Sequence, residues 1–186
     1  MLLRKWFVLV VMLNFQAYEI VQAAKPRFKL EFYRYDCLNI TQHIKVFQCV
    51  FEKDCFNSYI FSERLMFDRD LSDNFEMRVW INLKPMNGKK TLRFVDIKFK
   101  CCQVLATSLQ MPLLKSLLNE LWRSSNIPAE CPFKGNFIYK MNNFSFTDSY
   151  FPPYAPFLNF TFTMEFFDRK TLFAITKITG ATVPLT

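Results

Sequence analysis

The stretch FEMRVWINLKPMNGKKTLRFVDIKF, residues 75–99, contains two runs of alternating apolar and polar residues on either side of a turn sequence. Apolar residues at every second position are typical of strands that bury one face. The turn includes Asn87-Gly88, and both residue types tolerate the positive φ that tight hairpins require. We therefore predict a β-hairpin over residues 75–99.

Similar alternation occurs on both sides of this hairpin. Residues 28–32 precede it, and residues 158–166 and 172–179 follow it. The last two runs are separated by the polar turn 168–170, so we expect them to pair with each other. Residues 137–146 are a further candidate strand. Many short strands in one chain favour a mainly β protein, either a sandwich or a barrel.

Residues 111–123 have a helical period instead. Apolar residues recur there at spacings of three and four, at Leu114, Leu117, Leu118, Leu121 and Trp122. Pro112 is acceptable in the first turn of a helix, and Pro128 restricts Ile127 to extended backbone beyond its end. We predict one amphipathic helix that packs on the sheet.

The first 23 residues are typical of a secretory signal peptide. Arg4 and Lys5 precede eight apolar residues, and a small-residue site ends at Ala23. A membrane anchor would need roughly 20 apolar residues, and this apolar run is much shorter. We expect cleavage after Ala23, no stable membrane insertion, and a single secreted domain over residues 24–186.

The cysteines and sequons agree with export. Six cysteines follow the cleavage site, namely Cys37, Cys49, Cys55, Cys101, Cys102 and Cys131. An even number in an exported chain predicts disulfides, but their spacing alone leaves fifteen connectivities open. Three sequons predict surface glycans at Asn39, Asn143 and Asn159.

The composition is basic and rich in phenylalanine. The expected mature chain carries a formal charge of +7, and the whole chain contains 23 phenylalanines. The positive charges are spread along the chain, so solubility explains them better than a lipid or acidic glycan surface does. Phenylalanines suit a β-core and also line apolar pockets. We expect no nucleic-acid partner for an exported chain.

The sequence contains no recognisable catalytic motif. His43 is the single histidine, no G-x-S-x-G motif is present, and the chain has three glycines in all. We interpret His43 as a surface residue without a catalytic partner. Asp68, Asp70 and Asp73 read as a solvated turn that lacks the glycine of a calcium loop. One histidine and no Cys-x-x-Cys pair also argue against a metal site. We therefore predict no enzyme, no cofactor and no metal.

The order of motifs resembles a known family. Eleven residues separate Cys37 from Cys49, and the Asn-Gly hairpin is followed by the segment 100–105, KCCQVL. The predicted helix then leads into residues 125–132, SNIPAECP. This arrangement resembles an insect family of small secreted proteins of unknown function. That family is similar to the chemosensory CheB proteins and, more distantly, to the ML lipid-recognition superfamily.

The resemblance implies a two-sheet, immunoglobulin-like (ML-type) β-sandwich with an apolar interior. It also implies disulfides Cys37–Cys49 and Cys102–Cys131. Cys55 and Cys101 go beyond the family pattern, and either they pair with each other or the implied pairing is wrong. Adjacent residues on a strand point to opposite faces, so we expect Cys101 and Cys102 to have different partners.

Two functions follow as hypotheses. The first is a secreted binding protein for a hydrophobic small molecule or lipid, with a possible part in chemosensation. Candidate lining residues are Phe75, Met77, Val79, Ile81, Phe160, Phe162, Met164 and Phe166, with Leu117 and Leu121 at the entrance. The alternative is a protein–protein interaction module with a solid core that contacts a receptor through Trp80, Phe151 and Tyr154. A pocket of several hundred Å³ would favour the first hypothesis.

Overall fold

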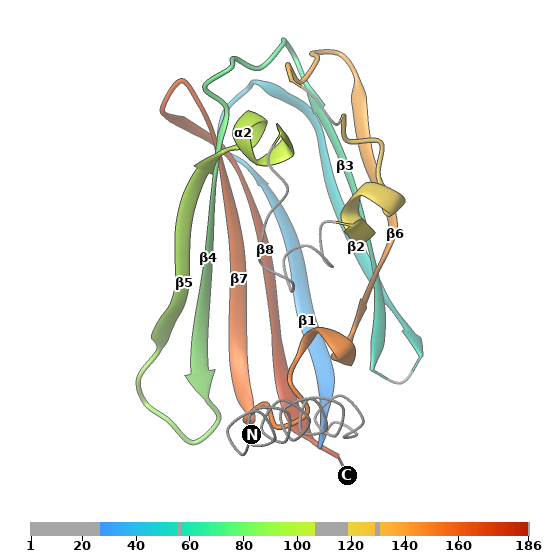
Figure 1. Ribbon diagram of the computed structural model, residues 1–186, viewed down its shortest axis with the longest axis vertical. Helices are drawn as coiled ribbons and strands as arrows, with labels where there is room; N and C mark the ends of the chain where they lie inside the picture. The colour runs from blue at the N-terminus through green and yellow to red at the C-terminus, as the bar shows by residue number, and fades with distance from the viewer. Residues whose placement is uncertain (1–26, 56, 107–118, 129–130, 186) are drawn as a thin grey trace, which may run out of the picture.

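A computed structural model describes residues 27–55, 57–106, 119–128 and 131–185 of the chain (Figure 1). The expected signal peptide, Leu117 and most of the expected helix lie outside the described residues. Within the described part of the chain, no helix is long and apolar enough to cross a bilayer.

The described residues form eight strands in two antiparallel sheets. The five-stranded sheet has the order β1-β8-β7-β4-β5, with bounds Phe28–Asn39, Thr171–Pro184, Leu158–Asp168, Glu76–Pro85 and Leu92–Lys100. The three-stranded sheet has the order β2-β3-β6, with bounds Ile44–Cys55, Ser58–Phe67 and Ile138–Thr147. The prediction of a mainly β, two-sheet sandwich is confirmed.

The predicted hairpins are present. Strands β4 and β5 pair across the Asn-Gly turn, with Val79 opposite Ile97. Strands β7 and β8 pair across a tight turn in which Arg169 and Lys170 both have positive φ. Strand β8 is longer than expected, because its other edge pairs with β1 and places Phe28 opposite Pro184. The first and last of the described strands are therefore neighbours.

The hairpin β2–β3 was not expected from the sequence. The side chains that it packs into the sandwich do alternate, at Phe47, Cys49, Phe51, Tyr59, Phe61, Glu63, Leu65 and Phe67. Glu63 places a carboxyl group in this apolar set, and the outward positions also contain apolar residues such as Val50. The alternation is therefore not recognisable in the sequence unless the register of the sheet is known.

The helical content is small among the described residues. Helix α2 covers Cys101–Ala106, residues 119–124 are helical, and η1 is a short turn over Asp148–Tyr150. The expectation that Cys101 and Cys102 lie on a strand is wrong, because β5 ends at Lys100 and both cysteines begin α2. Their side chains still have different environments: Cys101 is buried, whereas Cys102 is half-buried.

The core consists of two clusters of buried side chains. One lies at the α2 end of the sandwich and contains Phe67, Phe75 and Phe166. The other surrounds Phe32 and Phe61, whose ring centroids are 5.0 Å apart. Both clusters contain residues from both sheets, so burial of aromatic surface holds the sheets together.

Candidate functional site

The candidate lining residues of β4 and β7 share the inner face of the five-stranded sheet. Phe75 and Phe166 are buried in the α2-end cluster, and Phe160 is buried in the other cluster. Met77 and Met164 pack against the α2-end cluster. These five side chains lie on the inner face that the alternation predicted, and they form core.

The remaining three candidates differ from these five. Val79, Ile81 and Phe162 are half-buried, and none of them packs against either core cluster of the described residues. Ile81 lies directly opposite Phe162 in the register. The middle of the inner face therefore carries apolar side chains that the described core does not cover.

This apolar surface continues onto β5, the edge strand. Val95 lies opposite Ile81, and Ile97 lies opposite Val79, so both extend the same face. The exposed fraction is 44 % for Ile97 and 62 % for Leu92. We call the set Val79, Ile81, Leu92, Val95 and Ile97 the open face. An exposed apolar area of this kind is typical of a binding surface.

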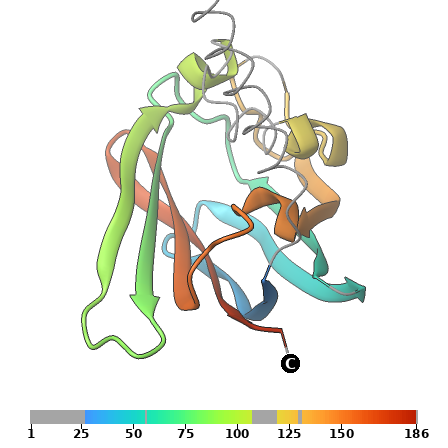
Figure 2. The same cartoon turned by 60° about the horizontal axis from the view of Figure 1, so that its bottom comes forward.

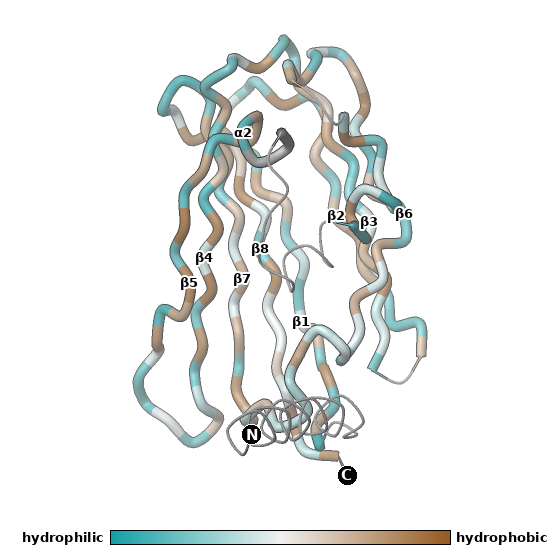
Figure 3. Tube along the Cα trace, in the orientation of Figure 1, coloured by the Kyte–Doolittle hydropathy of each residue, from teal (hydrophilic) through white to brown (hydrophobic). Residues whose placement is uncertain are grey.

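The arrangement of the sheets explains the exposure. Strands β1 and β2 follow each other and lie side by side, whereas β5 and β6 lie at opposite sides of the molecule (Figures 1 and 2). The two sheets therefore diverge from the β1–β2 side toward β5 and β6. Hydrophobic and hydrophilic residues alternate along β4 and β5 (Figure 3), as expected when one face is apolar.

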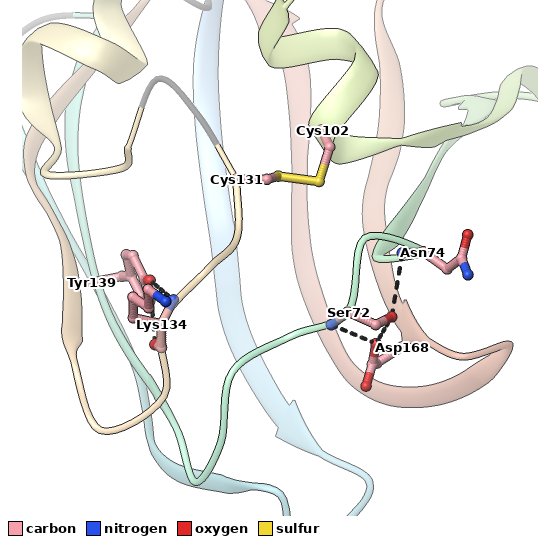
Figure 4. Close-up of a disulfide and its surroundings, with 7 residues drawn as sticks. All are labelled: Ser72, Asn74, Cys102, Cys131, Lys134, Tyr139 and Asp168. Carbon is pink, nitrogen blue, oxygen red and sulfur yellow. Dashed lines mark hydrogen bonds between the residues drawn. A yellow bond between two sulfur atoms is a disulfide. The ribbon is translucent and has the colours of Figure 1, made fainter.

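Two disulfides tie the sheets together, one on each side. Cys37–Cys49 joins β1 to β2, and Cys102–Cys131 joins α2 to the segment that precedes β6 (Figure 4). Both pairings implied by the family resemblance are confirmed. The second disulfide links the elements next to β5 and β6, where the sheets diverge most.

Cys55 and Cys101 do not pair with each other. Cys55 is exposed at the end of β2, whereas Cys101 is buried among the side chains of the α2-end cluster. Burial raises the pKa of the Cys101 thiol to about 12. Cys101 is therefore an unreactive apolar side chain of the core.

An ionisable side chain lies between the two core clusters. Glu63 belongs to the inward set of β3, and its Oε2 accepts a 2.6 Å hydrogen bond from the hydroxyl of Tyr35 on β1. Desolvation raises the pKa of the Glu63 carboxyl to about 7, although the Tyr35 hydrogen bond acts in the opposite direction. The pKa of the Tyr35 hydroxyl is also raised, first by burial and then by the Glu63 carboxyl.

Glu63 lies beside the Cys37–Cys49 disulfide. A carboxylate oxygen of Glu63 and both sulfur atoms lie within 4.8 Å of one another. A metal would need thiolates, and these two sulfurs are bonded to each other instead. Glu63 is the candidate site residue that the sequence did not reveal, and its signal was a carboxylate in an otherwise apolar alternation.

His43 has a hydrogen-bond partner that the sequence did not reveal. Its Nδ1 lies 3.1 Å from Oδ2 of Asp68, and this pair is part of the wall of a pocket of about 120 Å³. The His43 hydrogen bond lowers the pKa of the Asp68 carboxyl. The pocket volume is below the roughly 300 Å³ of most ligand sites. It lies at the end of the sandwich, away from the candidate residues of β4.

Nearby carboxylates make structural contacts. Asp70 accepts hydrogen bonds from the Gly135 amide and the Lys134 ammonium group, and these contacts lower its pKa. Buried Asp168 accepts hydrogen bonds from the amide and hydroxyl of Ser72 (Figure 4). These contacts fix the loop between β3 and β4 to its neighbours.

The residues of the alternative hypothesis have three different environments. Phe151 is half-buried and packs against the core cluster around Phe32. Trp80 is half-buried, and the guanidinium of Arg93 lies 4.7 Å from its ring centroid. Tyr154 is 75 % exposed.

The helix and sequon residues lie at the periphery. Leu121 is half-buried in the helical segment 119–124. Asn39 and Asn143 are exposed, and Asn159 is half-buried on β7. Glycans at these positions remain a prediction.

A second pocket of about 380 Å³ is polar and shallow, and it lies beside the helical segment 119–124. Its lining residues are Arg123, Ser124, Ser125, Asn126, Lys140 and Asn142. None of the residues of the open face lines either pocket.

Comparison with known families gives one match and one negative result. No curated protein sequence matches the chain. A family model described as "Protein of unknown function (DUF1091)" matches residues 75–162, which begin just before β4 and end within β7. The matched region contains the predicted hairpin and the Cys102–Cys131 disulfide, and over this region the chain is similar to a family of unknown function.

Proposed function

We propose that the protein is a secreted binding protein for a hydrophobic small molecule or lipid. The observation that carries this proposal is the open face, where an edge strand exposes Leu92 and Ile97 beside half-buried Val79 and Ile81. A β-sandwich would ordinarily bury these inner-face positions in its core.

The energetics favour an apolar ligand at this face. Burial of apolar surface contributes about 25 cal/mol per Å², so covering several half-exposed side chains would supply several kcal/mol. The resemblance to the CheB and ML proteins supports the same function and a part in chemosensation. The two disulfides support an oxidising destination such as the extracellular space.

Ligand uptake tests the proposal directly. The full chain would be expressed in insect cells, and the secreted protein would be titrated with N-phenyl-1-naphthylamine, a neutral probe that fluoresces in apolar surroundings. Native mass spectrometry before and after extraction with organic solvent would identify any lipid carried from the cells. We expect saturable probe binding that an extracted lipid or 1-decanol displaces.

A matched pair of variants locates the site. One variant, Val95→Asn, changes a residue of the open face. The other, Val50→Asn, changes an exposed residue of β2 that points away from the interior, because its neighbour Cys49 points inward. We expect Val95→Asn to weaken probe binding several-fold and Val50→Asn to leave it unchanged. Equal effects of the two variants would mean that the ligand binds elsewhere on the protein. A protein that takes up no probe would favour the alternative function, a protein–protein interaction module.

A further inference from the structure

The interior of the sandwich contains polar groups that the apolar open face does not explain. Glu63 projects from β3, and the hydroxyl of Tyr35 on β1 donates a hydrogen bond to its carboxyl group. Thr176 of β8 is fully buried, and its Oγ1 has no hydrogen-bond partner. A buried hydroxyl without a partner is destabilising, so its presence needs an explanation.

The register brings these groups to one level of the sandwich. Thr176 lies directly opposite Cys37 on the neighbouring strand, and Glu63 lies within 4.8 Å of the Cys37 sulfur. Glu63 and Thr176 therefore approach the same disulfide from the two sheets. We call Tyr35, Glu63 and Thr176 the polar triad.

The polar triad adjoins the apolar residues of the proposed site. Met164 lies opposite Thr176 on its other side, and Val79 lies opposite Met164. A row across the sheet thus runs from the polar triad to the open face. Thr176 is fully buried and Met164 packs against the α2-end cluster, so a molecule can lie along this row only when these side chains move aside. It would then place one end on apolar side chains and the other end near Thr176.

The hydrogen-bonding capacity of the polar triad is incomplete. Tyr35 bonds one oxygen of Glu63, and no other described side chain donates to the carboxyl group. The Glu63 side chain also keeps part of its surface accessible. An ionised carboxylate only accepts hydrogen bonds, whereas the Thr176 hydroxyl both donates and accepts. Together they suit a group that can donate to one and accept from the other.

We propose that the polar triad receives the polar end of the ligand, and that the ligand is a hydrophobic alcohol rather than a fatty acid. A hydroxyl group can donate to Glu63 and accept from Thr176. A ligand carboxylate would face the Glu63 carboxylate in a poorly hydrated interior, where like charges repel strongly. This inference rests on the proposed function and adds the chemical class of the ligand.

Three probes of equal chain length test the inference at pH 8. Decane, 1-decanol and decanoate would each compete with N-phenyl-1-naphthylamine on the secreted protein and on Glu63→Gln. We expect Glu63→Gln to weaken 1-decanol about tenfold, because a charged acceptor becomes a neutral amide and charge-assisted hydrogen bonds are the stronger ones. It should leave decane unchanged and strengthen decanoate, because the repelling charge is gone.

A second variant keeps the test decisive if Glu63→Gln does not fold. Thr176→Val removes only the hydroxyl from a residue of nearly the same shape, and it should weaken 1-decanol while leaving decane unchanged. Equal effects of these variants on 1-decanol and decane, or no effect on either, would overturn the inference while binding itself persists. Failure of the unaltered protein to bind any of the three probes would instead overturn the proposed function.

Discussion

The two sides of the sandwich use similar residues in different ways. On the β1–β2 side, Phe32 and Phe61 of opposite sheets are in ring contact and almost completely buried. On the β5 side, Leu92 and Ile97 are 62 % and 44 % exposed. The comparison shows that alternation marks an apolar face, whereas only the position of the second sheet decides whether that face becomes core or stays exposed.

The largest difference in unfolding free energy is expected between variants of two phenylalanines. Phe61→Ala removes a ring that contacts Phe32, Tyr35 and Phe51, and should lower the free energy of unfolding by about 3–5 kcal/mol. Phe94→Ala, on exposed β5, should change it by about 0.5 kcal/mol or less. Chemical denaturation measures both, and similar losses would mean that the β5 side is as well packed as the β1 side.

Removing each disulfide in turn tests how much it stabilises its own side of the sandwich. Cys102–Cys131 closes 29 residues of chain and Cys37–Cys49 closes 12. By loop entropy, replacing both cysteines of the pair with alanine should cost about 4 kcal/mol for the first pair and about 3 kcal/mol for the second. Chemical denaturation of the two double variants shows which pair contributes more to the free energy of unfolding. The reverse order would show that native packing around Cys37 outweighs loop closure.

Glu63 should make the stability depend on pH. Its pKa rises from the ordinary value of 4.5 to about 7 in the folded protein. The folded state therefore holds this proton more tightly, and stability is greatest below about pH 4.5 and falls until about pH 7. The shift corresponds to about 3 kcal/mol.

Glu63→Gln should remove this loss of stability between pH 4.5 and 7, because glutamine does not titrate. Thermal or chemical unfolding at several pH values would measure the slope. The matched control is Glu52→Gln on the exposed part of β2, and this variant should still lose stability between pH 4.5 and 7. A slope that survives in Glu63→Gln would assign the pH dependence to other groups.

The smallest effect is expected for the valine pair of the binding test. Val95→Asn and Val50→Asn both replace an accessible valine on a strand, and each should cost about 1 kcal/mol or less. Their denaturation midpoints should agree closely, so any difference in probe binding would report the ligand site. A much larger loss for Val95→Asn would mean that Val95 is part of the packed core.

Local patterns were sufficient for much of the fold and for the apolar part of the site. Period-two alternation in residues 75–99 and 158–166 identified the inner face, because a strand alternates its faces whatever its partner is. The resemblance supplied both disulfide pairs, which spacing alone left open.

The sequence by itself therefore determined the strand faces and the central hairpin. Tertiary structure alone decided that β1 pairs with β8, that the sheets diverge beside β5, and that Glu63 meets Tyr35 and the Cys37–Cys49 disulfide. These features join residues that are far apart in the chain. Their energies depend on desolvation and on which surfaces are covered, and neither is a local property of the sequence.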